Sequence, residues 1–273
     1  MDRLAAWNYK APVRYRALFL SDMHLAARAC KSEELLSFLK SHDAADIYLV
    51  GDVFDFWRLR RNASWPPSQT EVVKELLAKA RNGSRITYIP GNHDNEIRTF
   101  AGTTLGPFEI RLQAVHITAD GRRFLVIHGD EFDVVIKRAR WLAVLGDVSY
   151  DLASLANTVL NSVRRAMGRP YWSLSAFLKY QVKRAVSYAG NFEKSVASAA
   201  RNAGAAGVIC GHIHHASMHL VDGIHYVNTG DWVDSCTAVV EHADGRLEII
   251  RWSDRLRSRK SPAAKAAAVS AAS

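Results

Sequence analysis

The sequence predicts an α/β protein built on a layered β-sheet. Short apolar stretches alternate with amphipathic stretches along much of the chain, and most of the apolar stretches run into a loop that contains Gly or Asp. Strands that alternate with helices are typical of a sheet with helices packed on it. The 273 residues, 48% of them hydrophobic, suffice for one sizeable core or two small ones.

The expected elements follow from these stretches in chain order. Residues 17–20 of YRALFLSDMHL predict a buried strand that runs into a loop, and the same pattern recurs in IYLVGD, ITYIPGNHD, RRFLVIHGD and AGVICGHIHHA. SEELLSFLK and TEVVKELLAKA have the apolar spacing of helices. Two β-hairpins are expected near the end of the chain, with turns at Asp222-Gly223 and Asp244-Gly245.

One segment interrupts this alternation. Residues 133–190 contain helical patches such as WLAVLG and LSAFLKYQVKRAV and no predicted strand, so we expect a helical insertion in a domain that spans residues 14–252. Residues 253–273 form a basic, Ala-rich tail of low complexity that we expect to be disordered.

The net charge of +9 is unevenly distributed. Residues 133–190 hold nine Lys/Arg and three Asp/Glu, and residues 251–273 hold six and one, so the remainder is slightly acidic. A nuclease would explain a basic protein, because phosphate backbones favour positive charge. A surplus confined to the insertion and the tail argues against nucleic acid as a partner.

Cysteine content and the N-terminus bear on the cellular compartment. The three cysteines show no CxxC spacing, which favours a reducing compartment and argues against a thiolate metal site. Cys210 is expected to be a small core residue. MDRLAAWNYK has charges and a tryptophan where a signal peptide would need an unbroken apolar stretch, and no run approaches the roughly 18 apolar residues of a spanning helix. We expect a soluble cytoplasmic protein, or at most a peripheral membrane protein.

Polar side chains follow most of the predicted strands, where turns alone would not need them. Loops at the carboxyl ends of strands in an open α/β sheet meet in one crevice, so we expect these side chains to share a pocket: Asp22, His24, Asp52, Asn92, His93, Asp94, His128, His212 and His214. Asp22 and His24, like His212 and His214, are two residues apart and therefore project to the same side of an extended segment.

Seven of these residues offer oxygen and nitrogen donors that suit two divalent ions of the Mn, Fe or Zn kind, with Mn²⁺ the best single match. Asp52 could bridge the ions with both of its oxygens. Two ions about 3.5–4 Å apart clamp a phosphate and generate hydroxide for in-line attack. The alternative interpretation is that some of these side chains only cap strand ends.

The remaining histidines have no expected role in this site. His215 is expected to line the pocket wall and His225 to be structural, whereas His42, His116 and His242 are expected at the surface.

Five motifs carry a family resemblance. DMH, GDVFD, GNHD, HGD and GHIH occur in this order between Asp22 and His214, and together they resemble the calcineurin-like metallophosphoesterases. The resemblance implies a four-layer α/β/β/α sandwich and a binuclear metal centre in the domain of residues 14–252. It implies that one ion is held by Asp22, His24, Asp52 and His214, and the other by Asp52, Asn92, His128 and His212. It also implies that Asn92 and His93 contact the phosphate, that His93 protonates the leaving group, and that Asp94 orients His93.

Further residues point to a branch of the family. GDVFDFW, with Asp55 and Trp57, and NTGDW, with Asp231 and Trp232, are similar to the branch of the UDP-2,3-diacylglucosamine pyrophosphatases of lipid A biosynthesis. That resemblance implies hydrolysis to UMP and a lipid monophosphate at the cytoplasmic face of the inner membrane, with the insertion as a lid over acyl chains. The branch usually has arginine where this chain has His93, which leaves the choice of substrate open.

The insertion itself has features of a lipid-facing lid. Its apolar residues accompany basic clusters, and an amphipathic element of this kind can face anionic headgroups. Lys179, Lys183 and Arg184 are therefore expected to contact the substrate or an anionic membrane surface. Alternatively, the insertion covers its own apolar face and its basic residues are only solvated.

Other functions use the same metal ligands. A phosphodiesterase or phosphatase of a soluble nucleotide, or a protein phosphatase, would not need an apolar lid. A non-catalytic scaffold would be expected to lack some ligands, and all seven are present. The sequence gives no prediction of the oligomeric state.

Overall fold

The structure is a computed structural model that describes residues 12–61, 65–132, 167 and 191–254. The predicted lid at 133–190 therefore lies outside the described residues except for Met167, and so does the predicted disordered tail from residue 255 onward. The chain divides into two compact units, Met1–Asp130 with Ala197–Ser273 and Glu131–Val196. Among the described residues, no helix is long and apolar enough to span a bilayer.

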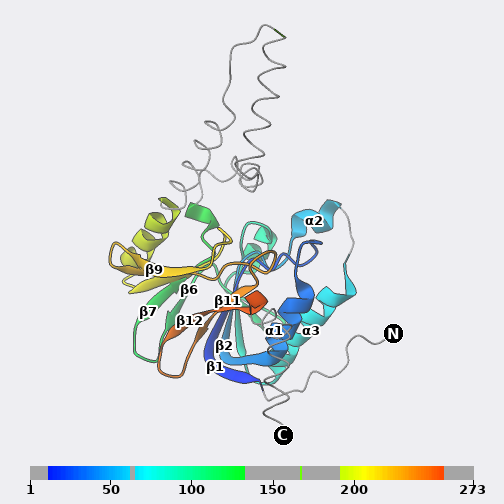
Figure 1. The fold of residues 1–273 in the computed structure, drawn as a ribbon, viewed down its shortest axis with the longest axis horizontal. Helices are drawn as coiled ribbons and strands as arrows, with labels where there is room; N and C mark the ends of the chain where they lie inside the picture. The colour runs from blue at the N-terminus through cyan, green and yellow to red at the C-terminus, as the bar shows by residue number, and fades with distance from the viewer. Residues whose placement is uncertain (1–11, 62–64, 133–166, 168–190, 255–273) are drawn as a thin grey trace. The chain divides into compact units, whose positions relative to one another are not determined.

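The larger of two β-sheets has seven strands in the order β12-β11-β1-β2-β3-β5-β4 (Figure 1). Its central strands β1, β2 and β3 are parallel to one another, whereas β11 pairs antiparallel with β1. The strands are β1 (Val13–Leu20), β2 (His42–Val50), β3 (Arg85–Ile89), β4 (Thr104–Leu105), β5 (Phe108–Ile110), β11 (Thr237–Glu241) and β12 (Leu247–Arg251).

The second sheet has five strands in the order β6-β7-β8-β10-β9. In it β8 is parallel to both β7 and β10, while β6 and β9 pair antiparallel at the two edges. The strands are β6 (Ala114–Ile117), β7 (Arg123–Val126), β8 (Gly207–Cys210), β9 (Ser217–Val221) and β10 (Ile224–Asn228).

Helices follow several of the parallel strands. α1 (Ser32–Ser41) connects β1 to β2, and α2 (Phe56–Arg61) and α3 (Pro67–Arg81) connect β2 to β3. Two short 3₁₀ helices are η1 (Asn95–Phe100) and η2 (Asp130–Phe132), and residues 191–202 are helical before β8. Two sheets flanked by helices confirm the predicted α/β sandwich class. The sequence missed α2, β4, β5 and β6.

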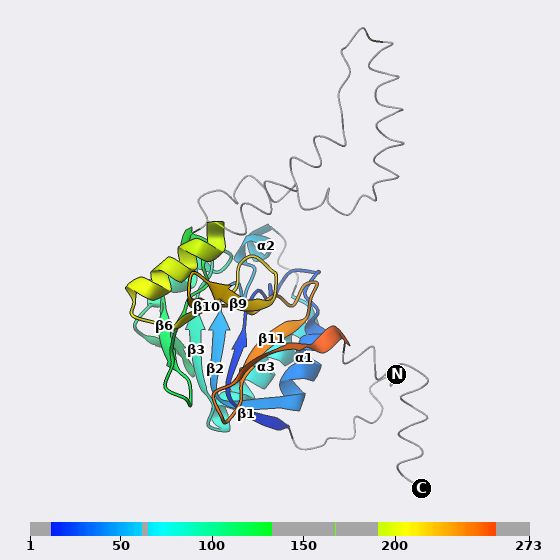
Figure 2. The ribbon, with the colours of Figure 1, turned by 60° about the vertical axis from the view of Figure 1, so that its left-hand side comes forward.

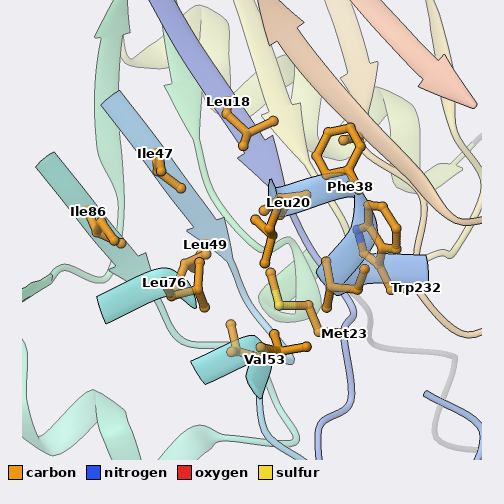
Figure 3. Packing of buried hydrophobic residues seen from close by; sticks show 14 of the residues in the cluster. Leu18, Leu20, Met23, Phe38, Ile47, Leu49, Val53, Leu76, Ile86 and Trp232 are labelled. Atoms are coloured by element: carbon orange, nitrogen blue, oxygen red, sulfur yellow. The ribbon is translucent and has the colours of Figure 1, made fainter. Parts of the chain in front are cut away.

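The side chains of β1 alternate between two hydrophobic clusters because successive residues of a strand face opposite sides of the sheet. Leu18 and Leu20 pack with Phe38 of α1 and Leu76 of α3 in the cluster shown in Figure 3. Ala17 and Phe19 belong to a second cluster that also contains residues of the other sheet, among them Phe124, Val126, Ile209 and Val227. The larger sheet is therefore buried on both faces.

Both predicted hairpins are present. Asp222 and Gly223 connect β9 to β10 with φ angles of 50° and 81°. Two positive φ angles in a two-residue loop are the geometry that matches the twist of antiparallel strands and favours Asp-Gly. The second hairpin joins β11 to β12 around Asp244-Gly245.

Three predictions for individual side chains can be compared with the structure. Cys210 is fully buried, as predicted, and Cys30 and Cys236 are also buried. The prediction that His42 and His116 lie at the surface is wrong, because they are 2% and 3% exposed. His42 bonds the carbonyl of Phe38 through Nδ1 at 2.9 Å, and His116 binds Glu241. These hydrogen bonds allow the two imidazole rings to be buried. The partners are not apparent from the residues next to each histidine in the sequence.

Candidate metal centre

The predicted site residues lie where the parallel strands end. Asp22, Asp52, His128 and His212 each stand two residues beyond the last residue of β1, β2, β7 and β8. Asn92 stands three residues beyond β3. In Figure 2 the arrowheads of β2 and β3 point toward the end of the sheet where α2 lies. Parallel strands thus deliver side chains from distant parts of the sequence to one edge.

The backbone at these positions adopts an unusual conformation. Asp22, His24, Asp52, His212 and His214 all have positive φ angles, between 47° and 70°. This left-handed region disfavours residues other than glycine, and such strain clusters at functional sites. Hydrogen bonds hold the loops in place, such as those from the amide of Asp22 to the carbonyl of Gly51 (3.0 Å) and from the amide of His24 to that of Asp52 (2.9 Å).

Three overlapping groups of side chains have the spacing of metal ligands. One is His24, Asp52 and His93, and the other two consist of predicted ligands alone. Asp22, His24 and His214 form one group, in which Asp22 Oδ1 lies 3.1 Å from His214 Nε2 and 4.0 Å from His24 Nε2. Asp52, His128 and His212 form the other, in which Asp52 Oδ1 lies 3.6 Å from His128 Nε2. Asp52 Oδ2 lies 3.8 Å from His24 Nε2, so this carboxylate stands between the two groups.

Hydrogen bonds orient the ligand atoms from behind. His128 Nδ1 bonds the carbonyl of Val50 at 2.9 Å, which leaves Nε2 facing Asp52. Asp22 Oδ2 accepts from the amide of His212 at 3.0 Å and from Ser21 Oγ at 2.5 Å, which leaves Oδ1 facing the histidines. Partners of this kind fix the orientation and tautomer of metal ligands.

The residues present fit divalent metal ions, for two reasons. Among the described residues, Asp22 Oδ1, Asn92 Oδ1 and His128 Nε2 are buried atoms without a hydrogen bond. Buried polar atoms are normally satisfied, so these atoms call for a ligand. Their mixture of carboxylate, amide and imidazole suits Mn²⁺, Fe²⁺ or Zn²⁺.

A glycine keeps space open beside these atoms. A Cβ atom at Gly91 would lie 2.4 Å from Asp52 Oδ1 and 2.6 Å from His128 Nε2. Any side chain at this position would therefore push into the ligand atoms, which explains the glycine of GNHD.

The charges of the site support cation binding. Burial alone would raise the pKa of Asp22, but His214 and His128 outweigh it and lower the pKa to about 2. Burial also opposes ionisation of Asp52, and His128 again reverses this effect, so the pKa of Asp52 is lowered. Burial lowers the pKa of His24 to about 4, which keeps this imidazole neutral. In return, and against the effect of burial, Asp52 raises the pKa of His128 to about 10 and Asp22 raises that of His214, so a metal ion bound here would displace a proton from each of these two rings.

His93 lies beside both groups and in contact with further residues. Its Nε2 is 4.0 Å from Asp52 Oδ2, its Nδ1 is 3.3 Å from Asp55 Oδ1, and its ring centroid is 4.0 Å from that of Trp57. His93 is 5% exposed, so its position is set by these neighbours. An imidazole held in this way next to the ligand atoms is placed to exchange a proton with a bound phosphate group.

The structure does not pair Asp94 with His93, contrary to the role that the family resemblance implied. The carboxylate of Asp94 is fully buried and accepts from the amides of Val53 (2.8 Å) and Gly91 (2.6 Å) and from the hydroxyl of Tyr88 (2.5 Å). Burial raises the pKa of Asp94, with Asp52 as a further cause. Asp94 thus holds the loops after β2 and β3 together.

Asp55 is the carboxylate next to His93, although its place in the sequence did not predict a part in the site. The signal lay in GDVFD, where the second aspartate follows the metal-site aspartate by three residues. Only the tertiary structure brings this short loop against GNHD. His215 is exposed, and Lys179, Lys183 and Arg184 lie outside the described residues.

Comparisons with known proteins identify a family and several relatives. The model of the family described as calcineurin-like phosphoesterase matches residues 15–216. A UDP-2,3-diacylglucosamine hydrolase of Neisseria meningitidis serogroup B is 26% identical over 242 residues, which cover 82% of this chain and 92% of that protein. The protein of the same name from Porphyromonas gingivalis is 28% identical over 134 residues, which cover 46% of this chain and only 50% of its own length.

Solved structures of low sequence identity were also found. A Pyrococcus horikoshii protein, PH1004, has a TM-score of 0.47 at 11% identity, over 92% of this chain and 95% of that one. A phosphoesterase from E. coli has a TM-score of 0.40 at 14% identity, over 86% and 98%.

The chain belongs to the calcineurin-like phosphoesterase family. It is a metal-dependent hydrolase of the phosphoesterase and pyrophosphatase kind, as the five motifs indicated. Divalent metal ions are its cofactors, and its substrate carries a phosphate group.

Proposed function

We propose that this protein hydrolyses the phosphoanhydride of a lipid-linked substrate, UDP-2,3-diacylglucosamine, to UMP and a lipid monophosphate. The observation that carries the catalytic part of the proposal is the cluster of buried, unsatisfied ligand atoms around Asp52 with His93 beside it. The substrate is proposed from the relatives named UDP-2,3-diacylglucosamine hydrolase, one of which matches 82% of this chain.

The proposed ligand sets divide between the two groups of side chains. Asp22, His24 and His214 would hold one ion, Asn92, His128 and His212 the other, and Asp52 would bridge them. Bound ions of this kind polarise a phosphoryl oxygen and lower the pKa of a bound water. We assign Mn²⁺ as the best match to a donor set without thiolate.

The protein's own side chains supply the proton chemistry. His93 is proposed to donate a proton to the leaving oxygen, since its Nε2 faces the ligand atoms while its Nδ1 faces Asp55. The Asp55 carboxylate would orient the ring. The pKa of Asp55 is lowered despite its burial, because His93 and the amide of Arg58 bond it, so it stays negative near neutral pH.

The proposal places the protein at the cytoplasmic face of a membrane, through the lid of residues 133–190. Each basic residue near an anionic surface contributes on the order of 1 kcal/mol, screened by salt. Charge reversal of Lys179, Lys183 and Arg184 should therefore weaken sedimentation with anionic vesicles. Unchanged sedimentation, or none with the unaltered protein, would contradict the membrane part of the proposal.

Turnover of a substrate panel tests the substrate directly. UDP-2,3-diacylglucosamine in detergent, other lipid phosphates, cyclic nucleotides and bis(p-nitrophenyl) phosphate are compared, with UMP measured as product. The proposal expects the highest kcat/KM for the diacylated substrate. A preference for a cyclic nucleotide would contradict it and indicate a soluble-nucleotide phosphodiesterase.

Deletion of residues 133–190 is the matched control. It is expected to abolish turnover of lipid substrates and to spare hydrolysis of bis(p-nitrophenyl) phosphate.

A further inference from the structure

α2 places a basic and aromatic surface beside His93. The amide of Phe56, the first residue of α2, donates to the carbonyl of His93 at 3.1 Å, and the ring of Trp57 lies against the imidazole. The six residues FWRLRR contain three arginines and no buried side chain. Figure 2 shows α2 at the end of the larger sheet toward which β2 and β3 run.

Trp57 is more exposed than a packing role requires. Its side chain contacts His93, yet the residue remains 45% exposed. A large aromatic ring left half in water beside a site of phosphate chemistry offers a flat apolar face to whatever is joined to the phosphate. Trp57 therefore presents an exposed aromatic face next to His93.

The helical repeat decides which arginine shares this face. Residues three and four positions apart lie on one side of a helix, so Arg60 and Arg61 are on the side of Trp57, whereas Arg58 is about 100° away. Arg60 is paired with Glu96 of η1, the 3₁₀ helix that follows GNHD. Among the described residues neither Arg58 nor Arg61 forms an ion pair, and both are exposed. Arg61 is thus a guanidinium on the site-facing side whose charge is not compensated within the described part of the chain.

We propose that Trp57 and Arg61 of α2 form a subsite for a second phosphate group of the substrate, next to the one that the metal centre attacks. Guanidinium groups bind phosphate oxygens through paired N–H donors. Arg61 would bind the second phosphate, and the exposed face of Trp57 would pack against the group attached to it. The subsite makes the enzyme selective for diphosphate diesters over monophosphates. This inference rests on the proposed function, because a simple phosphomonoester has no second phosphate.

Competitive inhibition of bis(p-nitrophenyl) phosphate hydrolysis tests the subsite without requiring cleavage of the ligand. UDP-N-acetylglucosamine carries two phosphates, UMP carries one, and the two have similar total charge. We expect the ratio of the inhibition constant of UMP to that of UDP-N-acetylglucosamine to fall about tenfold in Arg61→Ala, as loss of one charged hydrogen-bonding contact predicts. Arg58→Ala, which removes the same charge from another side of α2, should leave the ratio unchanged.

Three results would overturn the subsite: an unchanged ratio in Arg61→Ala, an equal fall in Arg58→Ala, or no inhibition by UDP-N-acetylglucosamine where UMP inhibits. Failure of the proposed function looks different. In that case UDP-2,3-diacylglucosamine is not hydrolysed by the unaltered protein, while the inhibition ratio still responds to Arg61→Ala.

Discussion

Two buried groups of histidine and carboxylate side chains differ in how their polar atoms are satisfied. The first group, called the intersheet cluster below, consists of His116 of β6, Glu241 of β11 and their polar neighbours. His116 Nε2 lies 2.6 Å from Glu241 Oε2, and this contact joins the two sheets. Glu241 Oε1 accepts from the amide of Ala119 at 2.7 Å and lies 3.1 Å from Arg16 Nε. His116 Nδ1 lies 3.3 Å from the hydroxyl of Tyr48. Each charged group in this cluster is matched by the protein itself.

The metal centre contains the same residue types, but several of its buried polar atoms have no hydrogen-bond partner in the protein. Asp22 Oδ1, Asn92 Oδ1 and His128 Nε2 are buried without hydrogen bonds, and the backbone of Asp22 has a φ angle of 50°. Backbone strain and unsatisfied atoms both cost stability in the absence of a ligand. A buried histidine and carboxylate pair therefore stabilises the fold when other protein groups hydrogen-bond its polar atoms. When those atoms have no protein partner, the pair forms a binding site.

Asp52→Asn should have the largest effect on function. The substitution removes the negative charge between the two ligand groups, so we expect loss of at least one metal ion and of nearly all turnover. The loss of turnover should exceed the roughly 10–100-fold that follows from removing a residue that only hydrogen-bonds a metal ligand. Metal analysis and turnover by the purified variant check this. A variant with both ions and a near-normal rate would show that Asp52 is not the bridge.

His93→Ala should leave the ions bound and lower turnover by about 10²–10⁴-fold, the usual effect of losing a general acid. The loss should shrink for p-nitrophenol, a leaving group that needs little protonation. His219→Ala, which removes an exposed histidine of β9, should change neither the bound metal nor the turnover. Equal losses for good and poor leaving groups would indicate phosphate binding in place of proton transfer.

Glu241→Ala should damage stability and spare the metal centre. Burial lowers the pKa of His116, so near neutral pH the ring is a neutral donor to Glu241. The variant leaves this donor and the amide of Ala119 without their acceptor, which costs about 1–3 kcal/mol per buried group in the free energy of unfolding. The control is Glu248→Ala, because Glu248 Oε2 lies 2.8 Å from His242 Nε2 in a pair whose side chains are 33% and 27% exposed. Removing that exposed pair should cost no more than about 1 kcal/mol. Denaturant unfolding measures both, and equal losses would contradict the distinction.

Gln69→Ala should have the smallest effect of the four substitutions. Gln69 of α3 is 1% exposed, accepts from the amide of Ala26 at 2.6 Å and donates to the carbonyl of Ala27 at 2.9 Å. It thereby holds the loop that carries His24, in which Ala26 has a φ angle of 81°. We expect Mn²⁺ affinity to fall about tenfold, near the lower end for residues that support ligands. Calorimetric titration measures the Mn²⁺ affinity. The control is Gln113→Ala, which replaces an exposed glutamine and should leave this affinity unchanged.

The sequence predicted the metal centre better than the intersheet cluster. Asp22, Asp52 and His128 follow apolar strands, and parallel strands bring their ends together whatever the separation along the chain. The pairing of His116 with Glu241 spans 125 residues and leaves no local pattern, so His116 was wrongly predicted at the surface. The Asp55 contact with His93 was missed for a similar reason, because it depends on how two loops pack.

The metal content of the active protein tests the central claim most directly. Chelator-treated protein is equilibrated with increasing Mn²⁺, and bound metal and hydrolysis of bis(p-nitrophenyl) phosphate are measured on the same samples. The unsatisfied atoms around Asp52 predict that activity is lost with the metal and returns as the second ion per chain binds. Full activity after exhaustive chelation, or full activity with a single bound ion, would contradict the binuclear centre.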